Sequence, residues 1–297
     1  MSIFKGAGVA IVTPFTEDLQ VNYEKLDEII DFQIDNGTDA IIICGTTGES
    51  ATLSMEEHKQ VVRRCISHVS GRVPVIAGTG SNCTETAIEL SQEAENDGAD
   101  ALLIVTPYYN KATQNGLIRH YSQISDSVNI PIIMYNVPSR TGCTMQPKTA
   151  VEIVTRNKNV VGMKDAVGNQ SFTGQLAHLG REAGGKLEIY SGNDDQVLPI
   201  LSLGGLGVIS VLSNIMPRET HDMVMNYLNG NVQAATDFQL KAIPLINALF
   251  CEVNPIPVKT AMNLMGMNVG SLRGPLGDME PEHVEILKKA MQDMGLL

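Results

Sequence analysis

The chain contains 297 residues, 43% of them hydrophobic and 18% charged, a composition that supports a large buried core and excludes a disordered segment. Its formal net charge is −12 and no basic run is present, which argues against binding to nucleic acid or to an anionic membrane surface. An acidic protein repels an anionic substrate, so any such substrate needs a local cation.

Short apolar runs alternate with stretches of helical periodicity along most of the chain. Eight of these runs are expected to be strands, and because most are continuously hydrophobic they should be covered on both faces. They are Gly8–Thr13, Asp39–Cys44, Val73–Ala77, Asp100–Thr106, Ile130–Asn136, Val160–Lys164, Leu187–Ser191 and Gly207–Val211.

The intervening stretches carry signals for helices. The clearest helices are predicted over Tyr23–Asn36, Met55–Val69, Thr84–Asp97 and Gly116–Ser125. Ser54 and Glu57 have the spacing of a capping box, which marks the start of the second helix. Eight strand–helix units in succession predict a (β/α)8 barrel, the TIM barrel of the α/β class.

After residue 230 the strand signal stops. Residues 231–297 are predicted to be helices interrupted at Pro244, at Asn254–Pro257 and at Gly274-Pro275. We therefore expect a barrel that carries the active site in residues 1–230, followed by a C-terminal helical extension in residues 231–297.

The ends of the chain and its cysteines indicate the cellular compartment. The N-terminus lacks the apolar stretch of a signal peptide, and no apolar run is long enough to span a membrane. The five cysteines are scattered and form no CxxC pair, which is typical of a reduced protein. A cytoplasmic protein without a membrane or nucleic-acid partner is the expectation.

Lys164 is the most informative residue at the strand ends, where such barrels concentrate their chemistry. It ends the apolar run Val160–Lys164, a setting that no other lysine shares in the sequence. Loss of water around the ammonium would disfavour its charged form and lower its pKa. A lysine with a lowered pKa can form a Schiff base with a carbonyl substrate. The alternative is a lysine at a strand end that reaches solvent.

The other polar strand ends also allow structural interpretations. Gly45–Ser50 is either a strand-to-helix turn or a site that holds a small anion with backbone N–H groups and hydroxyls. Tyr109 and Tyr135 are either packing residues or functional phenols, and Arg140 is either a solvated charge or an anchor. No zinc-ligand spacing, phosphate-binding loop or GxSxG elbow is present. The remaining set suits Schiff-base chemistry on a small keto acid.

Several motifs in order resemble the dihydrodipicolinate synthase family, within the superfamily of Schiff-base, pyruvate-dependent aldolases and lyases. The resemblance covers essentially the whole chain. The motifs that carry it are Gly45–Leu53 (GTTGESATL), Ile76–Gly80 (IAGTG), Tyr135–Gly142 (YNVPSRTG), Gly162–Ala166 (GMKDA) and Asn254–Gly266 (NPIPVKTAMNLMG).

The resemblance implies that pyruvate condenses with L-aspartate 4-semialdehyde to give 4-hydroxy-tetrahydrodipicolinate in lysine and diaminopimelate biosynthesis, without a metal or an organic cofactor. Lys164 would form the Schiff base with pyruvate, and Thr47 with loop N–H groups would hold its carboxylate. Tyr135, Thr46 and Tyr109 match a proton relay, and Arg140 would anchor the carboxylate of the semialdehyde. Gly192 and Ile209 match positions whose backbone lines the pocket.

The resemblance further implies a homotetramer in which each tight dimer exchanges Tyr109 between active sites. An effector site for lysine is matched by Ser50, Ala51, His58, Asn82 and Tyr108. Met55 stands where feedback-inhibited members often have His, and Thr86 where they often have Glu, so weak or absent inhibition by lysine is expected.

Two other functions remain open at this point. One is a related aldolase or lyase that splits sialic acid or a 2-keto-3-deoxy sugar acid, against which Arg140 in its YNVPSRTG context counts. The other is a pyruvate-binding barrel without catalysis, against which the joint presence of Lys164, Tyr135, Thr46 and Tyr109 counts.

Overall fold

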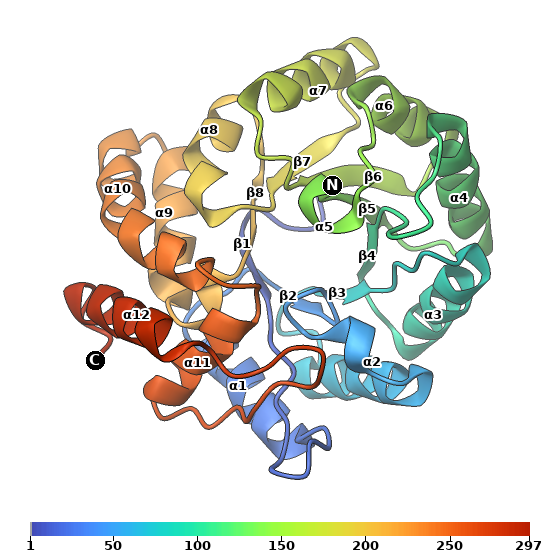
Figure 1. Cartoon of the computed structure of the whole chain (residues 1–297). Helices are drawn as coiled ribbons and strands as arrows, with labels where there is room; N and C mark the ends of the chain where they lie inside the picture. The colour runs from blue at the N-terminus through green and yellow to red at the C-terminus, as the bar shows by residue number, and fades with distance from the viewer. Residues whose placement is uncertain (1) are drawn as a thin grey trace.

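The computed structural model describes residues 2–297 and contains a closed barrel of eight parallel strands that pair in chain order (Figure 1). The predicted (β/α)8 fold is therefore confirmed. The strands are β1 Gly6–Ala10, β2 Ala40–Ile43, β3 Val75–Gly78, β4 Ala101–Val105, β5 Ile132–Asn136, β6 Val160–Asp165, β7 Glu188–Ser191 and β8 Gly207–Ser210.

Helices form a ring around the barrel (Figure 1). They are α1 Tyr23–Asp35, α2 Met55–Val69, α3 Thr84–Asp97, α4 Gln114–Ser127, α6 Pro147–Arg156, α7 Gln170–Glu182, α8 Val197–Ser202 and α9 Pro217–Leu228. The predicted capping box is present, because the Ser54 side chain accepts from Glu57 N and the Glu57 side chain accepts from Ser54 N. Three one-turn helices and one short helix stand in the loops: η1 Ser50–Thr52, η2 Asp194–Gln196, η3 Leu212–Asn214 and α5 Pro138–Thr141.

The first strand differs most from its predicted bounds, since β1 covers Gly6–Ala10 and not Gly8–Thr13. Pairing with β8 begins at Gly6, opposite Gly207. Ile11 N still donates to Ile42 O of β2 (3.2 Å), and the next amide, Val12 N, donates to the Asn214 side chain (3.2 Å) and not to a strand. An asparagine about two hundred residues away thus takes the place of the neighbouring strand just after β1.

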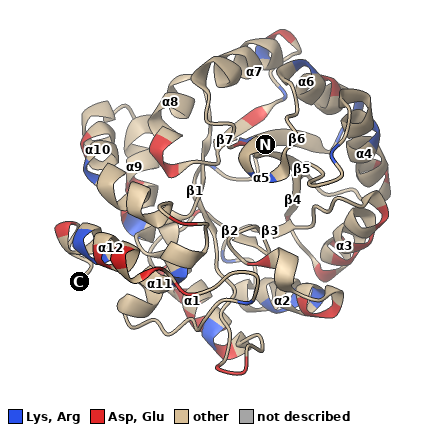
Figure 2. Ribbon diagram, viewed as in Figure 1, with Lys and Arg blue, Asp and Glu red and all other residues tan. Residues whose placement is uncertain are grey.

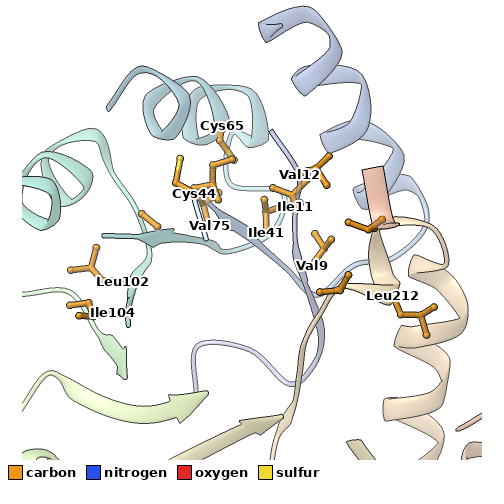
Figure 3. Packing of buried hydrophobic residues seen from close by; sticks show 14 of the residues in the cluster. Val9, Ile11, Val12, Ile41, Cys44, Cys65, Val75, Leu102, Ile104 and Leu212 are labelled. Carbon is orange, nitrogen blue, oxygen red and sulfur yellow. The ribbon is translucent and has the colours of Figure 1, made fainter. Parts of the chain in front are cut away.

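The buried apolar residues form three clusters. One fills the barrel interior and consists of Phe4, Ala10, Ala40, Ile42, Ile76, Ala101, Leu103, Ile133, Tyr135, Val137, Ala166, Tyr190 and Ile209. The largest lies between strands and helices and includes Val9, Ile41 and Val75 (Figure 3), and a smaller one includes Ala7 of β1 and Val208 of β8. Neighbouring residues of β2 therefore enter different cores, Ile41 outward and Ile42 inward, as side-chain alternation along a strand requires.

Three further helices follow the barrel: α10 Val232–Leu249, α11 Ile256–Leu264 and α12 Pro281–Asp293. The predicted break at Pro244 is wrong, because α10 runs through that residue. Proline removes one helical hydrogen bond, but Ala242, Leu245 and Leu249 are buried along α10, and this packing holds the helix on both sides. The other two predicted interruptions separate α10 from α11 and α11 from α12.

Charged side chains gather mainly on the surrounding helices (Figure 2). Among residues 2–297, no helix combines the length and the apolar character that crossing a membrane requires.

Closure of the barrel leaves no room for a side chain at Gly207, where a Cβ would stand 1.9 Å from Gly6 O. We expect Gly207→Ala to lower the free energy of unfolding by about 1–3 kcal/mol, because β1 and β8 must separate. Gly174 in α7 is the matched control, since a Cβ there meets nothing within 4 Å. Gly174→Ala should stabilise by about 0.5–1 kcal/mol. Urea denaturation measures both, and equal stabilities would contradict the argument.

Candidate active site

Strand register brings Lys164 into the barrel interior. In the parallel pairing, Tyr135 of β5 stands opposite Lys164 of β6, and Lys164 stands opposite Tyr190 of β7. Partners in register point to the same face of a sheet, and both tyrosines belong to the interior core. The amine of Lys164 consequently lies inside the barrel, with its Nζ 4.4 Å from the centroid of the Tyr135 ring.

A cavity of about 160 Å³ lies over Lys164 at the C-terminal ends of the strands. Six of the predicted site residues line it: Thr46, Thr47, Tyr135, Arg140, Lys164 and Gly192. Segments far apart in sequence therefore converge on one space, as expected at this end of a (β/α)8 barrel.

Burial is the main influence on the Lys164 amine. It lowers the pKa of Lys164 to about 8, and the positive charge of Arg140 acts in the same direction. The carboxyl group of Asp194 opposes the shift. Asp194 is itself buried and accepts hydrogen bonds from Val211 N and Leu212 N, both at 3.0 Å. The environment therefore supplies a lysine that deprotonates far more readily than one in water.

Tyr135 is a buried phenol beside this amine. Burial raises the pKa of Tyr135, whereas the charge of Arg140 and a hydrogen bond with the Thr46 side chain lower it. A neutral phenol in contact with a hydroxyl can both donate and accept a proton. Thr46 and Tyr135 thus place two hydroxyl groups, each able to donate and accept a proton, in the cavity that holds Lys164.

Asn254 connects two predicted substrate contacts and was missed by the sequence reasoning, although it lies within a quoted motif. Its Nδ2 donates to Thr47 Oγ1 (3.0 Å), and its backbone oxygen accepts from Arg140 Nη2 (3.3 Å). Because the Thr47 oxygen accepts this bond, its own O–H stays free to donate to an anion. Asn254 and Phe250 line the cavity from the C-terminal extension, outside the 1–230 segment to which the site was assigned.

Gly192 and Ile209 have different positions relative to the cavity. A Cβ at Gly192 would lie 2.7 Å from Ala166 Cβ and 3.1 Å from Lys164 Cε, so only glycine leaves room for the lysine chain. Ile209 is fully buried in the interior core and does not line the cavity in the described chain.

The model of the dihydrodipicolinate synthetase family matches residues 3–294. A curated relative from Lachnoclostridium phytofermentans, named 4-hydroxy-tetrahydrodipicolinate synthase, is 60% identical over 297 residues. The match covers 100% of this chain and 100% of the relative. The chain belongs to the dihydrodipicolinate synthetase family.

Solved structures of family members agree with the fold. The dihydrodipicolinate synthase of Thermotoga maritima has a TM-score of 0.97 and 42% identity, and the match covers 100% of both chains. The enzyme of Cyanidioschyzon merolae, solved with lysine bound, has a TM-score of 0.95 and 38% identity, again over 100% of both chains.

Tyr109, the third member of the predicted relay, does not line the cavity of its own chain. Its side chain is 90% exposed, and its backbone has a φ of 67°, in the left-handed region that favours glycine. The neighbouring Tyr108 is 37% exposed. Within one chain, the cavity therefore contains Thr46 and Tyr135 but not Tyr109, the third member of the predicted relay.

A second, larger cavity of about 420 Å³ adjoins the first and shares Thr46, Val137, Arg140 and Asn254 with it. It contains most of the predicted effector residues together with the two that depart from the pattern: Ser50, Ala51, Met55, His58, Thr86 and Tyr108. Asn82 does not line it, and its backbone oxygen accepts from Asn110 Nδ2 (2.9 Å). His58 is engaged as well, because its Nε2 lies 2.9 Å from Gly78 O and burial lowers its pKa.

Lys164 is not the only buried lysine in the described chain. Lys259 on α11 is 0% exposed and lies 2.9 Å from the Glu49 carboxylate. The sequence Pro257-Val258-Lys259 contains no strand signal. The burial of Lys259 therefore comes from the packing of α11, which the sequence pattern did not indicate. Among residues 2–297, no group of at least three His, Cys, Asp or Glu side chains could hold a metal ion.

The lowered pKa of Lys164 predicts a distinctive pH profile for its reactivity. The neutral amine is the nucleophile, so acylation by acetic anhydride should rise about tenfold per pH unit below the pKa and level off above it. With a pKa of about 8, the plateau should begin near that pH. Peptide mass spectrometry measures labelling, with exposed Lys148 as reference for reagent loss.

Lys259 is the internal control for access, because it is fully buried and lines neither cavity. It should stay unlabelled in the folded protein. A Lys164 profile that still rises steeply at pH 10, like that of an ordinary lysine, would show that its amine is not perturbed.

Proposed function

We propose that this chain condenses pyruvate with L-aspartate 4-semialdehyde to give 4-hydroxy-tetrahydrodipicolinate, through a Schiff base on Lys164. The observation that carries the proposal is the convergence of a readily deprotonated amine, two threonine hydroxyls, a phenol and a guanidinium on one cavity. Full-length curated relatives named for this activity support it.

The first half of the reaction activates pyruvate. The neutral Lys164 amine attacks the keto carbon, and loss of water leaves an iminium. Thr47 holds the pyruvate carboxylate through the O–H that its bond from Asn254 leaves free. Tyr135, backed by Thr46, donates the proton that lets water leave and accepts one as the methyl group becomes an enamine.

The second half forms the ring. The enamine carbon attacks the aldehyde of the second substrate, whose carboxylate binds Arg140 at the mouth of the cavity. The amine of that substrate then attacks the iminium carbon and displaces Lys164, which restores the free amine. The product leaves with both carboxylates, and all groups used belong to the protein or the substrates.

Purified protein tests the function directly. Pyruvate plus L-aspartate 4-semialdehyde should give product, and borohydride with pyruvate should leave a reduced adduct on the peptide that contains Lys164. Lys164→Arg should lose most activity, because a guanidinium stays protonated. An adduct on another lysine would overturn the mechanism, and cleavage of a sugar acid without condensation would favour a related aldolase.

Arg140 should select the second substrate. The chain has a net charge of −12, so an anionic aldehyde depends on a local cation. Loss of one charged hydrogen-bonded contact in Arg140→Ala should weaken binding by about 1.5–3 kcal/mol, raising the KM for semialdehyde about tenfold to a hundredfold. The KM for pyruvate should change far less. Arg156→Ala removes the same charge at an exposed position of α6 and is the control. Equal changes for both substrates would contradict the role.

Tyr109 should act in a neighbouring subunit of a homotetramer built from tight dimers. Its 90% exposure and its absence from the lining of its own cavity support this. Lys164→Ala and Tyr109→Phe proteins, each of low activity, should regain activity when dissociated and reassembled together. A mixed dimer then contains one site with an intact Lys164 and a donated Tyr109. Reassembly confirmed by mass without recovery would show that Tyr109 does not act in trans.

Lysine should inhibit this protein weakly. Glu49 is the only carboxylate among the described residues that line the larger cavity, and Lys259 already engages it. The ammonium of a bound lysine therefore lacks a free partner. Activity at subsaturating pyruvate should persist at millimolar lysine, and Thr86→Glu should increase sensitivity. Half-inhibition of the unmodified protein below millimolar lysine would refute this reasoning.

The five cysteines are all free, which supports a location in the reducing cytoplasm. Recovery of the activity in the secreted fraction of producing cells would contradict that location.

A further inference from the structure

A buried lysine that contacts no substrate cavity joins the C-terminal extension to the active-site loop. Lys259 is 0% exposed, and its ammonium donates to Thr13 O (3.1 Å), Glu49 Oε1 (2.9 Å) and Ser271 O (2.7 Å). All its N–H groups are thus satisfied, and its Nζ also lies 4.3 Å from the centroid of the Phe15 ring. A buried charge with this many partners is held in one place.

Glu49, the partner carboxylate, is equally constrained. Its side chain is 0% exposed, and its second oxygen accepts from Arg273 N (3.1 Å). Its backbone has φ 53° and ψ 34°, a left-handed conformation that disfavours a residue with a Cβ. Such a conformation persists where surrounding contacts impose it, and here the contacts are those of the carboxylate.

Glu49 belongs to the threonine loop, residues 45–50, which carries Thr46 and Thr47. Within this loop Glu49 N donates to Thr46 O (3.1 Å), so the turn at Glu49 directly sets the position of Thr46. Thr13 Oγ1 donates to Gly48 O (2.6 Å), while Thr13 O accepts from Lys259. The lysine therefore fixes the loop at two points, through Glu49 and through Thr13.

We propose that the buried Lys259–Glu49 ion pair positions the threonine loop so that the Thr46 and Thr47 hydroxyls face Lys164. Both are positioning residues, because Lys259 lines neither cavity and Glu49 lines only the larger one. The inference rests on the proposed function, in which Thr47 holds the pyruvate carboxylate and Thr46 supports Tyr135.

A purely structural role predicts a different outcome. Removing one partner of a buried pair leaves an uncompensated charge and destabilises any protein. A stabilising pair would lower the melting temperature without altering how fast the remaining folded molecules react with pyruvate. A positioning pair alters that rate, because a displacement of about 1 Å in a catalytic group can slow a reaction a hundredfold.

The variants are chosen to separate these outcomes. Lys259→Met removes the charge and the three donated bonds. Glu49→Gln keeps the shape and an oxygen that can accept from Lys259. The double variant Lys259→Met with Glu49→Leu replaces the pair with apolar groups, which often leaves stability unchanged, so a folded protein without the tether can be measured.

A second, partly buried pair of charged side chains serves as the control. Asp39 accepts from Ala7 N and from His221 Nδ1, both at 2.7 Å, at the opposite end of β1 and β2. Asp39→Asn should lower stability without touching the threonine loop. Each variant is compared at a temperature where circular dichroism shows it to be folded.

The readouts are the rate of borohydride-trapped pyruvate adduct on Lys164 at subsaturating pyruvate, and the KM for each substrate. We expect Lys259→Met and the double variant to trap pyruvate about tenfold to a hundredfold more slowly, with a raised KM for pyruvate and a nearly unchanged KM for semialdehyde. Glu49→Gln should retain most of the rate, and Asp39→Asn should trap at the rate of the unmodified protein.

A folded double variant that traps pyruvate at the unmodified rate would overturn the positioning role, as would an equal loss in Asp39→Asn. Absence of any adduct in the unmodified protein would instead refute the proposed function, so the two failures are distinguishable.

Discussion

The amine of Lys164 has to be held out of water inside a closed barrel, and much of the surrounding structure follows from that requirement. Burial lowers its pKa to about 8, and the guanidinium of Arg140 reinforces the effect. Gly192 has no side chain because one would lie 3.1 Å from the lysine Cε. The neighbouring carboxyl of Asp194 opposes this lowering of the pKa.

The strands and the segments that cover the open end of the barrel contribute different groups to the cavity. Tyr135 and Lys164 stand on strands whose register fixes their relative position. Thr47 stands on a loop and Arg140 on the short helix α5, and both bond to Asn254, which comes from the C-terminal extension. The extension therefore joins the groups assigned to the two substrate carboxylates, which a barrel alone would leave on separate loops.

The two cavities share part of their lining. Thr46, Arg140 and Asn254 belong to both, so an occupant of the larger cavity would touch residues that also line the cavity over Lys164. Glu49 lines the larger cavity and bonds to Lys259, so the buried ion pair adjoins that cavity as well.

The sequence by itself determined the class of fold and pointed to Lys164 as the candidate nucleophile. Eight buried apolar runs alternating with helical periods allow few other architectures, and Lys164 ends one of these runs. The capping box of α2 was equally local, because both of its bonds join residues within one turn. Helix termination at Pro244 was predicted wrongly, since packing on both sides of that residue outweighed the local preference.

Only the tertiary structure decided which polar residues meet. Asn254 reaches Thr47 across 207 positions of sequence, and Lys259 reaches Glu49 across 210. No periodicity or spacing signals such contacts, because they depend on how the C-terminal helices pack over the barrel mouth. The same holds for Tyr109. Only the folded chain shows that this side chain is 90% exposed and does not line the cavity of its own barrel. Local sequence patterns indicate which face of a helix or strand is buried. Which residues that face contacts depends on the arrangement of all the elements in the fold.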